Sequence, residues 1–536
     1  MSNSEHVPVL IVGAGPAGLT AALFLARLGI PALVVERHTN TSLHPRARGL
    51  NVRTMEIFRG AGLEAPIMQA GAALAASKYM LFVETLTGTE IRRVPDDDLV
   101  ITGTRLAAIT PCTWVQCAQD ELEPLVLAAA QQAGATVRFA TEMVALTQVD
   151  AGVTVTLRDV ATDTITTMRA SYVLAADGAK SRIRAALNIP FVEQAVQGHY
   201  VNIYFRADLR PWIQGREFAL CFVENPAAPG ILLAVNNADR WLFNAEYAPT
   251  TTSPEIFTPD QCRALVRAAV GVTDLPVEVL SVLPWDATAQ CVTQMQANRV
   301  FLLGDAAHTM PPAGGLGLNT GVADAHNLAW KLALVLKGNA PPSLLATFEA
   351  ERLPVAQQAV DQAARELNAE RPDGPPVDSK GDPLVEQLLP MLGFTYHSSA
   401  VFAAGESPEP GLHLDGQPGT RLPHGWLDQN GRQVSTLDLV EQGFVALLGP
   451  QGEAWRVLFQ EVAHQENMPL TVYRVAVDGE VADPTNQWCT TSGIDPSGML
   501  LVRPDGVVAW RARTYDATAI AQASLCFRQL FGYHQA

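Results

Sequence analysis

The sequence lacks the features that would direct the protein to nucleic acid, to a metal or to an oxidising compartment. Its 536 residues carry a formal net charge of −17 and contain no cluster of lysine and arginine, so we expect no nucleic-acid partner. The seven cysteines are scattered, form no C-x-x-C pair and match no Cys/His metal spacing. This pattern predicts a reducing compartment, with neither disulfides nor a metal site.

The chain also lacks a recognisable membrane or targeting segment. Its long apolar stretch, residues 7–35, has no basic region before it and is interrupted by four glycines and Arg27. It therefore matches neither a signal peptide nor a membrane span. We expect a cytoplasmic protein without membrane contact.

That apolar stretch instead has the pattern of a β-α-β unit. Residues 7–12 are a β-branched run, residues 17–28 have helical apolar spacing, and residues 30–35 form a second buried strand pattern. The turn between the first strand and the helix reads GAGPAG, which has the G-x-G-x-x-G spacing. The unit is therefore typical of a nucleotide-binding fold.

Each glycine of GAGPAG has a physical task. Gly13 permits the tight turn, Gly15 lets a pyrophosphate approach the backbone, and Gly18 lets the helix pack closely on the strand. The positive end of the helix attracts the anion. Glu36 stands 23 residues beyond Gly13, where its carboxylate can bind an adenosine ribose. The motif predicts a dinucleotide site, but it does not separate NAD from FAD.

A second glycine-rich stretch, GDAAHTMPPAGGLGLN, favours a flavin. A predicted strand at residues 300–303 leads to Asp305, whose carboxylate could bind ribityl hydroxyls. Pro311 and Pro312 then form a rigid wall, and three further glycines expose backbone before a helix that the apolar spacing predicts over residues 321–336. Peptide N–H groups and the positive helix end would stabilise negative charge on a reduced isoalloxazine.

The rest of the pattern predicts two further modules. Strand-like runs alternate with turn residues from residue 191 to residue 284, which predicts an antiparallel sheet in an inserted domain. Helices are expected at residues 121–132 and 344–366. The segment 368–383 is rich in Pro, Gly, Asp and Ser and is the best linker candidate, and strand-like runs follow it.

Three motifs, taken in order, resemble the class A FAD-dependent aromatic hydroxylases of the p-hydroxybenzoate hydroxylase and phenol hydroxylase type. They are GAGPAG with Glu36, DGAKSRIR at residues 177–184, and GDAAHTMPPAGGLGLN at residues 304–319. Near the C-terminus, PGTRLPHGWL, STLDL and LVRPDGVVAWR resemble the phenol hydroxylase and polyketide hydroxylase branch, in which this module is thioredoxin-like. The module has no C-x-x-C pair, so we expect it to support the structure or a dimer rather than redox chemistry.

The resemblance implies an α/β fold with a Rossmann-like FAD-binding domain, an inserted antiparallel-sheet substrate domain and a C-terminal thioredoxin-like domain. The expected bounds are 1–75, 100–185 and 290–367 for the FAD-binding domain, 76–99 and 186–289 for the substrate domain, 368–383 for the linker, and 384–536 for the thioredoxin-like domain.

The resemblance also implies which residues contact FAD. Asp305 would hold the ribityl chain, and Pro311 and Pro312 would form the wall near flavin C4a. The full expected set of cofactor contacts is Gly13, Gly15, Pro16, Ala17, Gly18, Glu36, Arg37, Arg46, Gln119, Asp177, Gly304, Asp305, Pro312, Gly315, Gly317, Leu318 and Asn319.

Some of these residues also have a plain structural interpretation. Arg46 could be a surface cation, Gln119 a polar residue at a helix N-terminus, and Asp177 a turn cap. His308 fits a structural histidine near the flavin better than an acid or a base.

Substrate contacts are expected from aromatic residues of the inserted sheet, although each also fits core packing. The candidates are Tyr204, Phe222, Trp241, Phe243 and Trp285. Arg206, Arg210 and Arg216 could pair with a substrate carboxylate, but solvent-facing positions suit them better. No residue is identified as a catalytic base.

By the resemblance, the reaction is a monooxygenation. NAD(P)H, with NADPH favoured, would bind transiently and reduce tightly but non-covalently bound FAD. Reaction with O₂ would give a flavin C4a-hydroperoxide that hydroxylates a phenolic ring. A polycyclic, polyketide-like aromatic is the first expectation for the substrate, and a simple phenol is the second. The protein would be a monomer or a homodimer.

Other functions remain as alternatives. The same scaffold could carry out Baeyer–Villiger oxygen insertion or epoxidation. A flavin halogenase would need a W-x-W-x-I-P element, and the sequence offers only PWDATA at residues 284–289. In a non-catalytic flavin-binding protein, the Gly304-Asp305 loop would have no purpose.

Overall fold

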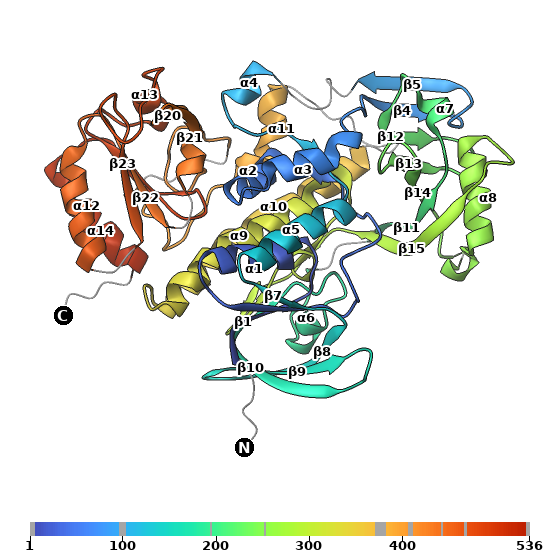
Figure 1. The fold of residues 1–536 in the computed structure, drawn as a ribbon, viewed down its shortest axis with the longest axis horizontal. Helices are drawn as coiled ribbons and strands as arrows, with labels where there is room; N and C mark the ends of the chain where they lie inside the picture. The colour runs from blue at the N-terminus through green and yellow to red at the C-terminus, as the bar shows by residue number, and fades with distance from the viewer. Residues whose placement is uncertain are drawn as a thin grey trace.

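The computed structural model describes residues 6–95, 103–192, 196–250, 253–369, 382–405, 411–440, 443–465 and 469–531. Sheets of eight, seven and four strands are the largest in this part of the chain, and helices pack against each of them (Figure 1). The predicted mixed α/β fold class is confirmed. No helix among the described residues is both long enough and apolar enough to cross a membrane.

The first sheet brings the glycine-rich motifs to one edge. Its strand order is β17 (Gln296–Ala297), β18 (Val300–Leu302), β10 (Ile165–Ala175), β1 (His6–Val12), β2 (Ala32–Val35) and β7 (Thr136–Arg138). β1 runs parallel to β2 and β10, and β10 runs parallel to β18. The carboxyl ends of these strands therefore meet, which is where ligands bind in open α/β sheets.

One strand of this sheet differs in detail from its predicted form, and a hairpin extends the sheet. β2 begins at Ala32 instead of residue 30, since Pro31 has no N–H to donate to the sheet. A hairpin of β8 (Thr141–Val149) and β9 (Gly152–Asp159) extends the sheet, because β9 pairs with the first half of the long strand β10.

The helices α1 (Pro16–Arg27), α5 (Gln119–Gln132) and α9 (Leu316–Leu336) cover the first sheet. α9 begins five residues before the predicted residue 321. Glycines inside the helix weakened the apolar pattern there, but they serve packing: a Cβ added at Gly321 would lie 3.1 Å from the Cα of Gly304 and 3.3 Å from the Cβ of Ala17.

The second sheet has the strand order β15 (Glu278–Thr288), β11 (Val196–Arg206), β14 (Arg240–Glu246), β13 (Gly230–Ala234), β12 (Phe218–Val223), β4 (Tyr79–Val83) and β5 (Glu90–Pro95). It is antiparallel except between β12 and β4. One face packs against the helix α8 (Pro259–Val270). The other face is half-buried and turned toward the first sheet's domain, since Tyr204 and Leu242 pack on Ala118 before α5.

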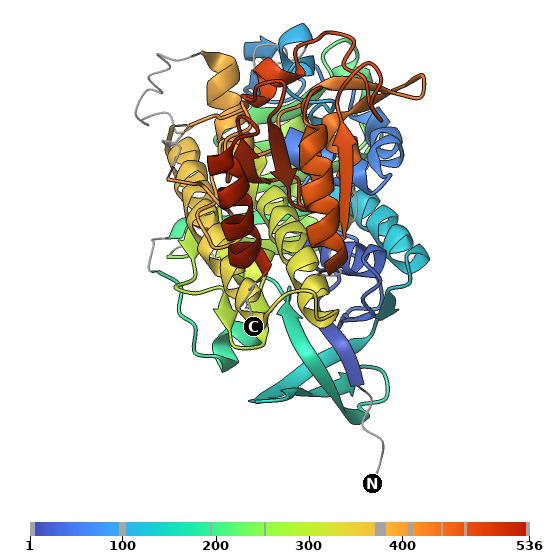
Figure 2. The same ribbon diagram turned by 90° about the vertical axis from the view of Figure 1, so that its left-hand side faces the viewer.

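The C-terminal module has a four-stranded sheet with the order β23 (Leu470–Arg474), β22 (Phe444–Leu448), β24 (Met499–Val502) and β25 (Val508–Ala512). The helices α12 (Glu453–Gln465) and α14 (Ala517–Phe531) cover one face of it. Figure 2 shows this module in front of α9 and α10 (Ala346–Ala369). Trp330 and Leu334 of α9 belong to the module's apolar core.

The predicted linker, 368–383, lies mostly outside the described residues. Asn368 still belongs to α10, and Pro383 begins α11 (Pro383–Leu392), which Asp382 caps by accepting a hydrogen bond from the Leu384 N–H. All seven cysteines are free thiols.

A group of charged side chains is buried where the C-terminal module meets α9 and α10. Glu351 accepts hydrogen bonds from Lys331 Nζ at 2.7 Å and from both terminal nitrogens of Arg503 at 2.6 and 2.9 Å. Arg503 Nε also donates to Asp505 at 3.0 Å. Burial lowers the pKa of Lys331 to about 8, an effect that Glu351 opposes.

Replacing Glu351 by alanine is expected to lower the free energy of unfolding by about 3–5 kcal/mol, because two buried cations would keep only Asp505 as their carboxylate. Urea unfolding followed by tryptophan fluorescence measures the change. Glu224→Ala, at an exposed position, is the control and should shift stability by less than about 0.5 kcal/mol. Equal unfolding midpoints for the two variants would show that the buried ion group adds nothing to stability.

Candidate functional site

Three glycines at the edge of the first sheet have distinct surroundings. Gly13 has a φ of +106°, and a Cβ added there would lie 2.2 Å from the carbonyl oxygen of Ala176. A Cβ at Gly18 would lie 2.0 Å from the Gly13 oxygen. No atom lies within 4 Å of a Cβ placed on Gly15. Gly13 and Gly18 are therefore needed for packing, while Gly15 faces open space.

The N-terminus of α1 is available for an anion. Its N-cap is Gly15, so no side chain caps the first turn, and that turn has no acidic residue. The free N–H groups of the turn and the positive helix end would bind a phosphate. Ala17 lies under the loop that begins at Gly304, 3.2 Å from a Cβ placed there.

Glu36 lies beside this turn, as its spacing predicts. One carboxylate oxygen accepts a hydrogen bond from the Ala14 N–H at 2.9 Å. The other accepts from the His38 N–H at 2.9 Å and contacts His38 Nδ1 at 2.5 Å. His38 and Arg37 are exposed, so among the side chains a ribose bound to Glu36 would compete with a surface imidazole.

Arg46 and Gln119 lie in adjoining segments. Arg46 is exposed, whereas Gln119 is buried and begins α5. The Gln119 amide oxygen accepts a hydrogen bond from the Ala47 N–H at 3.2 Å, and its nitrogen donates to Glu123 at 2.7 Å. Gln119 therefore holds the segment that carries Arg46, and only one of its amide hydrogens remains for a ligand.

Asp305 lies in a short 3₁₀ turn, Gly304–Ala306, directly after β18. Its side chain is exposed, yet burial raises the pKa of its carboxyl, while His308 and Arg46 lower it. Arg46 and Asp305, far apart in the sequence, thus lie on the same surface.

Asp324 of α9 fixes the shape of this loop from below. It is fully buried and accepts hydrogen bonds from the Gly304 N–H at 3.1 Å and from His308 Nε2 at 2.7 Å. Its second oxygen accepts from Arg352 Nε at 2.8 Å. His308 is itself buried, so it has the structural role that the sequence favours.

The glycine-rich start of α9 exposes backbone, as its sequence predicts. Gly314 and Gly315 have φ values of +69° and +62°, and Gly315 is an N-cap without a side-chain cap. Pro311 is buried, whereas Pro312 is exposed beside this turn. Gly317 and Leu318 follow it, both half-buried.

Asn319 ties this helix start to the segment around residue 50. Its amide oxygen accepts from the Asn51 N–H at 3.0 Å, and its nitrogen donates to the carbonyls of Gly49 and Gly315 at 3.0 and 2.6 Å. Trp114 lies in the same place, because its ring edge is next to both Gly49 and Gly315. Asn319 is thus occupied by protein contacts.

Asp177 follows β10 at the same edge. One oxygen accepts from the Ile183 N–H at 3.3 Å, which caps the turn, and the other is buried without a hydrogen-bond partner. Within the same motif, Arg184 donates to the carbonyl of Ala306 at 3.1 Å. The DGAKSRIR motif therefore braces the loop that carries Asp305.

Five aromatic residues were predicted as substrate contacts, and two of them lie on the wrong face of the second sheet. Trp241 and Phe243 are fully buried in the core against α8, where a ligand cannot reach them. Phe222 and Trp285 lie on the half-buried face, stacked on Phe82 and Tyr200. Tyr204 shares that face but is buried beside His44.

The sequence interpretation missed several polar residues near this face. Asn202 and Asn244 pair across β11 and β14, and their amide oxygens are buried without a hydrogen-bond partner. His44 is buried and contacts Ser281 Oγ through Nδ1 at 3.1 Å, and burial lowers its pKa. His44 stands two residues before Arg46 in HPRARG, and this proximity is the sequence signal that could have found it.

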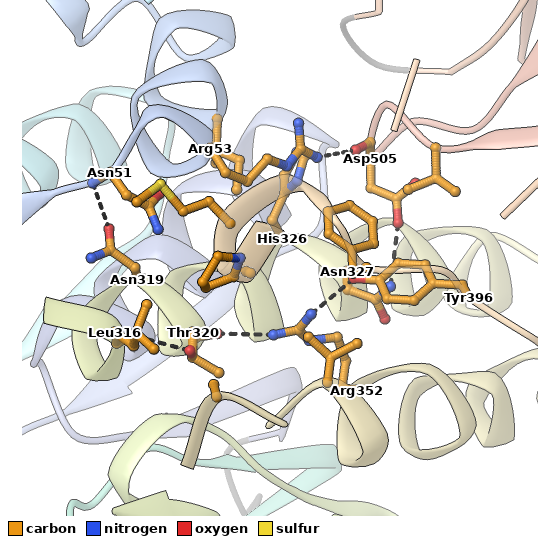
Figure 3. Close-up of a pocket in the computed structure, with 18 residues that line it drawn as sticks. Asn51, Arg53, Leu316, Asn319, Thr320, His326, Asn327, Arg352, Tyr396 and Asp505 are labelled. Atoms are coloured by element: carbon orange, nitrogen blue, oxygen red, sulfur yellow. Dashed lines mark hydrogen bonds between the residues drawn. The ribbon is translucent and has the colours of Figure 1, made fainter. Parts of the chain in front are cut away.

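A small cavity between α9, α10 and the C-terminal module is a separate feature (Figure 3). Its volume is about 40 Å³, enough for at most a few water molecules. Asn319, His326, Arg352 and Tyr396 are among its lining residues. The lining residues of α9 do not include Gly321, which packs on the Gly304 loop. This cavity is therefore separate from the edge of the first sheet where a cofactor would bind.

The residues at the edge of the first sheet fit FAD. The uncapped N-terminus of α1, with open space above Gly15 and Arg46 nearby, suits phosphates. The uncapped N-terminus of α9 suits an electron-rich ring edge. Asp305 and Glu36 supply the carboxylates that hydroxyl groups of a dinucleotide would need.

Comparison with known proteins agrees with this fit. Residues 6–363 match the FAD binding domain family, and residues 415–533 match the family described as aromatic-ring hydroxylase, C-terminal. Tetracenomycin A2 monooxygenase-dioxygenase of Streptomyces glaucescens is 40% identical over 530 residues, which cover 95% of this chain and 94% of the relative. The 4-methyl-5-nitrocatechol 5-monooxygenase of a Burkholderia species is 37% identical over 526 residues, with coverage of 95% and 94%.

A solved structure has the same fold along the whole chain. The ternary complex of aklavinone-11 hydroxylase with FAD and aklavinone has a TM-score of 0.88 and 34% sequence identity, and the match covers 99% of this chain and 100% of that one. The resemblance seen in the motifs is thereby confirmed. The chain belongs to the FAD-dependent aromatic-ring hydroxylases, and its cofactor is FAD.

Proposed function

We propose that FAD binds along the carboxyl edge of the first sheet. Its phosphates would meet the N-terminus of α1 and Arg46, and its ribityl chain would meet Asp305. Glu36 would bind the adenosine ribose beside Arg37. The flavin ring would lie with one edge toward Gly315, Gly317 and Leu318 and with Pro312 nearby.

We infer that the protein uses NAD(P)H and O₂ to hydroxylate a phenolic ring. When bound, FAD supplies the hydride acceptance and the oxygen activation that the reaction needs. The chain itself must exclude water and hold the ring carbon in place. One observation carries this proposal: the segment 48–51 contacts both the start of α9 and the second sheet. The expected flavin edge and the expected substrate face therefore adjoin the same segment.

The half-buried face of the second sheet is suited to a flat aromatic substrate. It carries aromatic and aliphatic side chains from Trp285 on β15 across to Phe222 on β12 and Phe82 on β4. The unpaired amide oxygens of Asn202 and Asn244 can accept hydrogen bonds from ring hydroxyls. These groups would orient the ring, while the apolar side chains would keep water out.

We propose a multi-ring, polyketide-like aromatic as the substrate class. The breadth of the half-buried face and the similarity to tetracenomycin and aklavinone enzymes support it. A single substituted phenol is the second candidate, which the similarity to the nitrocatechol monooxygenase favours.

Gly15→Ala is expected to lower FAD retention at least about tenfold without unfolding the protein. The added methyl group meets no protein atom, but it would occupy the space that a pyrophosphate needs. FAD content after gel filtration and far-UV circular dichroism measure the two effects. Gly60→Ala, also with open space around its Cβ, is the control and should keep its FAD. Full FAD occupancy in the Gly15 variant would argue against this phosphate position.

The activity is tested by NADPH and NADH consumption against a panel of phenols and polycyclic aromatic polyketides under ¹⁸O₂. We expect one class of phenol to stimulate consumption and to gain one ¹⁸O atom as a ring hydroxyl. A labelled ester or epoxide would instead indicate oxygen insertion. If no aromatic stimulates consumption in FAD-loaded protein, the proposed function is wrong.

A further inference from the structure

Arg48 is half-buried, and it differs from the buried cations such as Arg352 and Arg503 in having no acidic partner among the described residues. Its guanidinium donates to the carbonyl of Ala234 at 2.5 Å and to that of Ala219 at 3.2 Å. No carboxylate in the described ranges forms an ion pair with it. Burial alone lowers the pKa of Arg48 to about 10, so it remains charged at neutral pH.

The position of Arg48 joins the flavin edge to the second sheet. Its neighbour Gly49 is bonded to Asn319 at the start of α9 and packs against Trp114. At its other end, the guanidinium reaches β12 and β13 one residue from Leu220 and Leu233, which face each other on the half-buried surface. Arg48 therefore lies where the flavin edge and the aromatic substrate are proposed to meet.

The Arg48 guanidinium has N–H groups that make no hydrogen bond to the carbonyls of Ala234 and Ala219. The two carbonyls use two of its five N–H groups, which leaves three donors. A charge that is partly removed from water and has no counter-ion is unfavourable, and an anionic ligand would offset that penalty. Such a ligand would form charge-assisted hydrogen bonds, which are stronger than those to neutral acceptors.

The charged groups of neighbouring elements already have other partners. Asp120 and Glu121 of α5 both pair with Arg240 of β14. Asp305 lies near Arg46 and His308. His44, four residues before Arg48, has its pKa lowered by burial, so it is neutral at neutral pH and cannot balance or repel the charge. None of these groups in the part of the chain that the structure describes pairs with Arg48, which leaves the place of its anion to a ligand.

We propose that Arg48 binds an ionised oxygen of the aromatic substrate, a phenolate or the enolate of a 1,3-diketone, and so selects substrates that carry one. This inference rests on the proposed hydroxylase function and names its substrate more closely. The ionised ring is the more electron-rich form, so the same contact that holds the substrate also keeps it in its reactive state. The proton leaves to solvent when the substrate binds.

The test compares two ligands on the oxidised, FAD-loaded protein without NADPH. One is the phenol that best stimulates NADPH consumption in the panel above, and the other is its methyl ether, which cannot ionise. Flavin absorbance gives the Kd of each. In the wild type, we expect the phenol to bind about 10- to 100-fold more tightly than the ether.

Arg48→Gln should raise the Kd of the phenol by about 10- to 100-fold and that of the ether by less than about threefold. Arg48→Lys should recover part of the difference, because it keeps the charge but loses the planar fork. Arg210→Gln, an exposed arginine paired with Asp208, is the matched control and should change neither Kd. An equal loss for both ligands, or no loss for either, would overturn the proposal.

A measurement on the wild type alone guards against a variant that fails to fold. The ultraviolet difference spectrum should show the bound phenol as phenolate at a pH about one to three units below its free pKa. A bound phenol that stays neutral there would refute the role of Arg48 while leaving the hydroxylase function intact. If no aromatic stimulates NADPH consumption at all, the proposed function fails, and this inference fails with it.

Discussion

The flavin domain depends on backbone segments that meet without side chains between them. Gly18 lies so close to Gly13, and Gly13 so close to Ala176, that neither position has room for a methyl group. Gly321 of α9 lies against Gly304 in the same way. These contacts bring the ends of β1, β10 and β18 to the starts of α1 and α9. The surface at that point consists largely of peptide groups, which suits an anionic and planar cofactor.

The local parts of this arrangement could be predicted from the sequence. The strand, turn and helix around GAGPAG follow from residue spacing alone, and the same holds for the carboxylates at Glu36 and Asp305, which follow strand ends. Their convergence on one edge follows from the parallel order of the strands. α9 begins earlier than the apolar spacing predicts, because Gly317 and Gly321 look like loop residues in a sequence but are part of the helix in the structure, where Gly321 serves packing.

The sequence does not show which face of a strand is covered by an element far away in the chain. The alternation in RWLFNAEY shows that Trp241 and Phe243 share one face of a strand, but it does not show that α8 covers that face. Phe222 and Trp285 lie on the half-buried face, which α8 does not cover, but their sequence pattern does not show this either. Similarly, HPRARG contains two arginines that look equivalent. Only the structure separates the exposed Arg46 from Arg48, whose guanidinium contacts two carbonyls of the second sheet.

The buried ion group at the C-terminal module limits how that module could be exchanged between homologous proteins. Glu351 and Lys331 of the flavin domain pair with each other, and so do Arg503 and Asp505 of the module. The ion pair between Arg503 and Glu351 joins these two pairs across the boundary. A chimera that exchanges the module between homologues must therefore transfer a compatible Arg-Asp pair in the same setting. A chimera joined within residues 370–381 whose two parents differ at these positions would leave a buried charged group without its partner across the boundary.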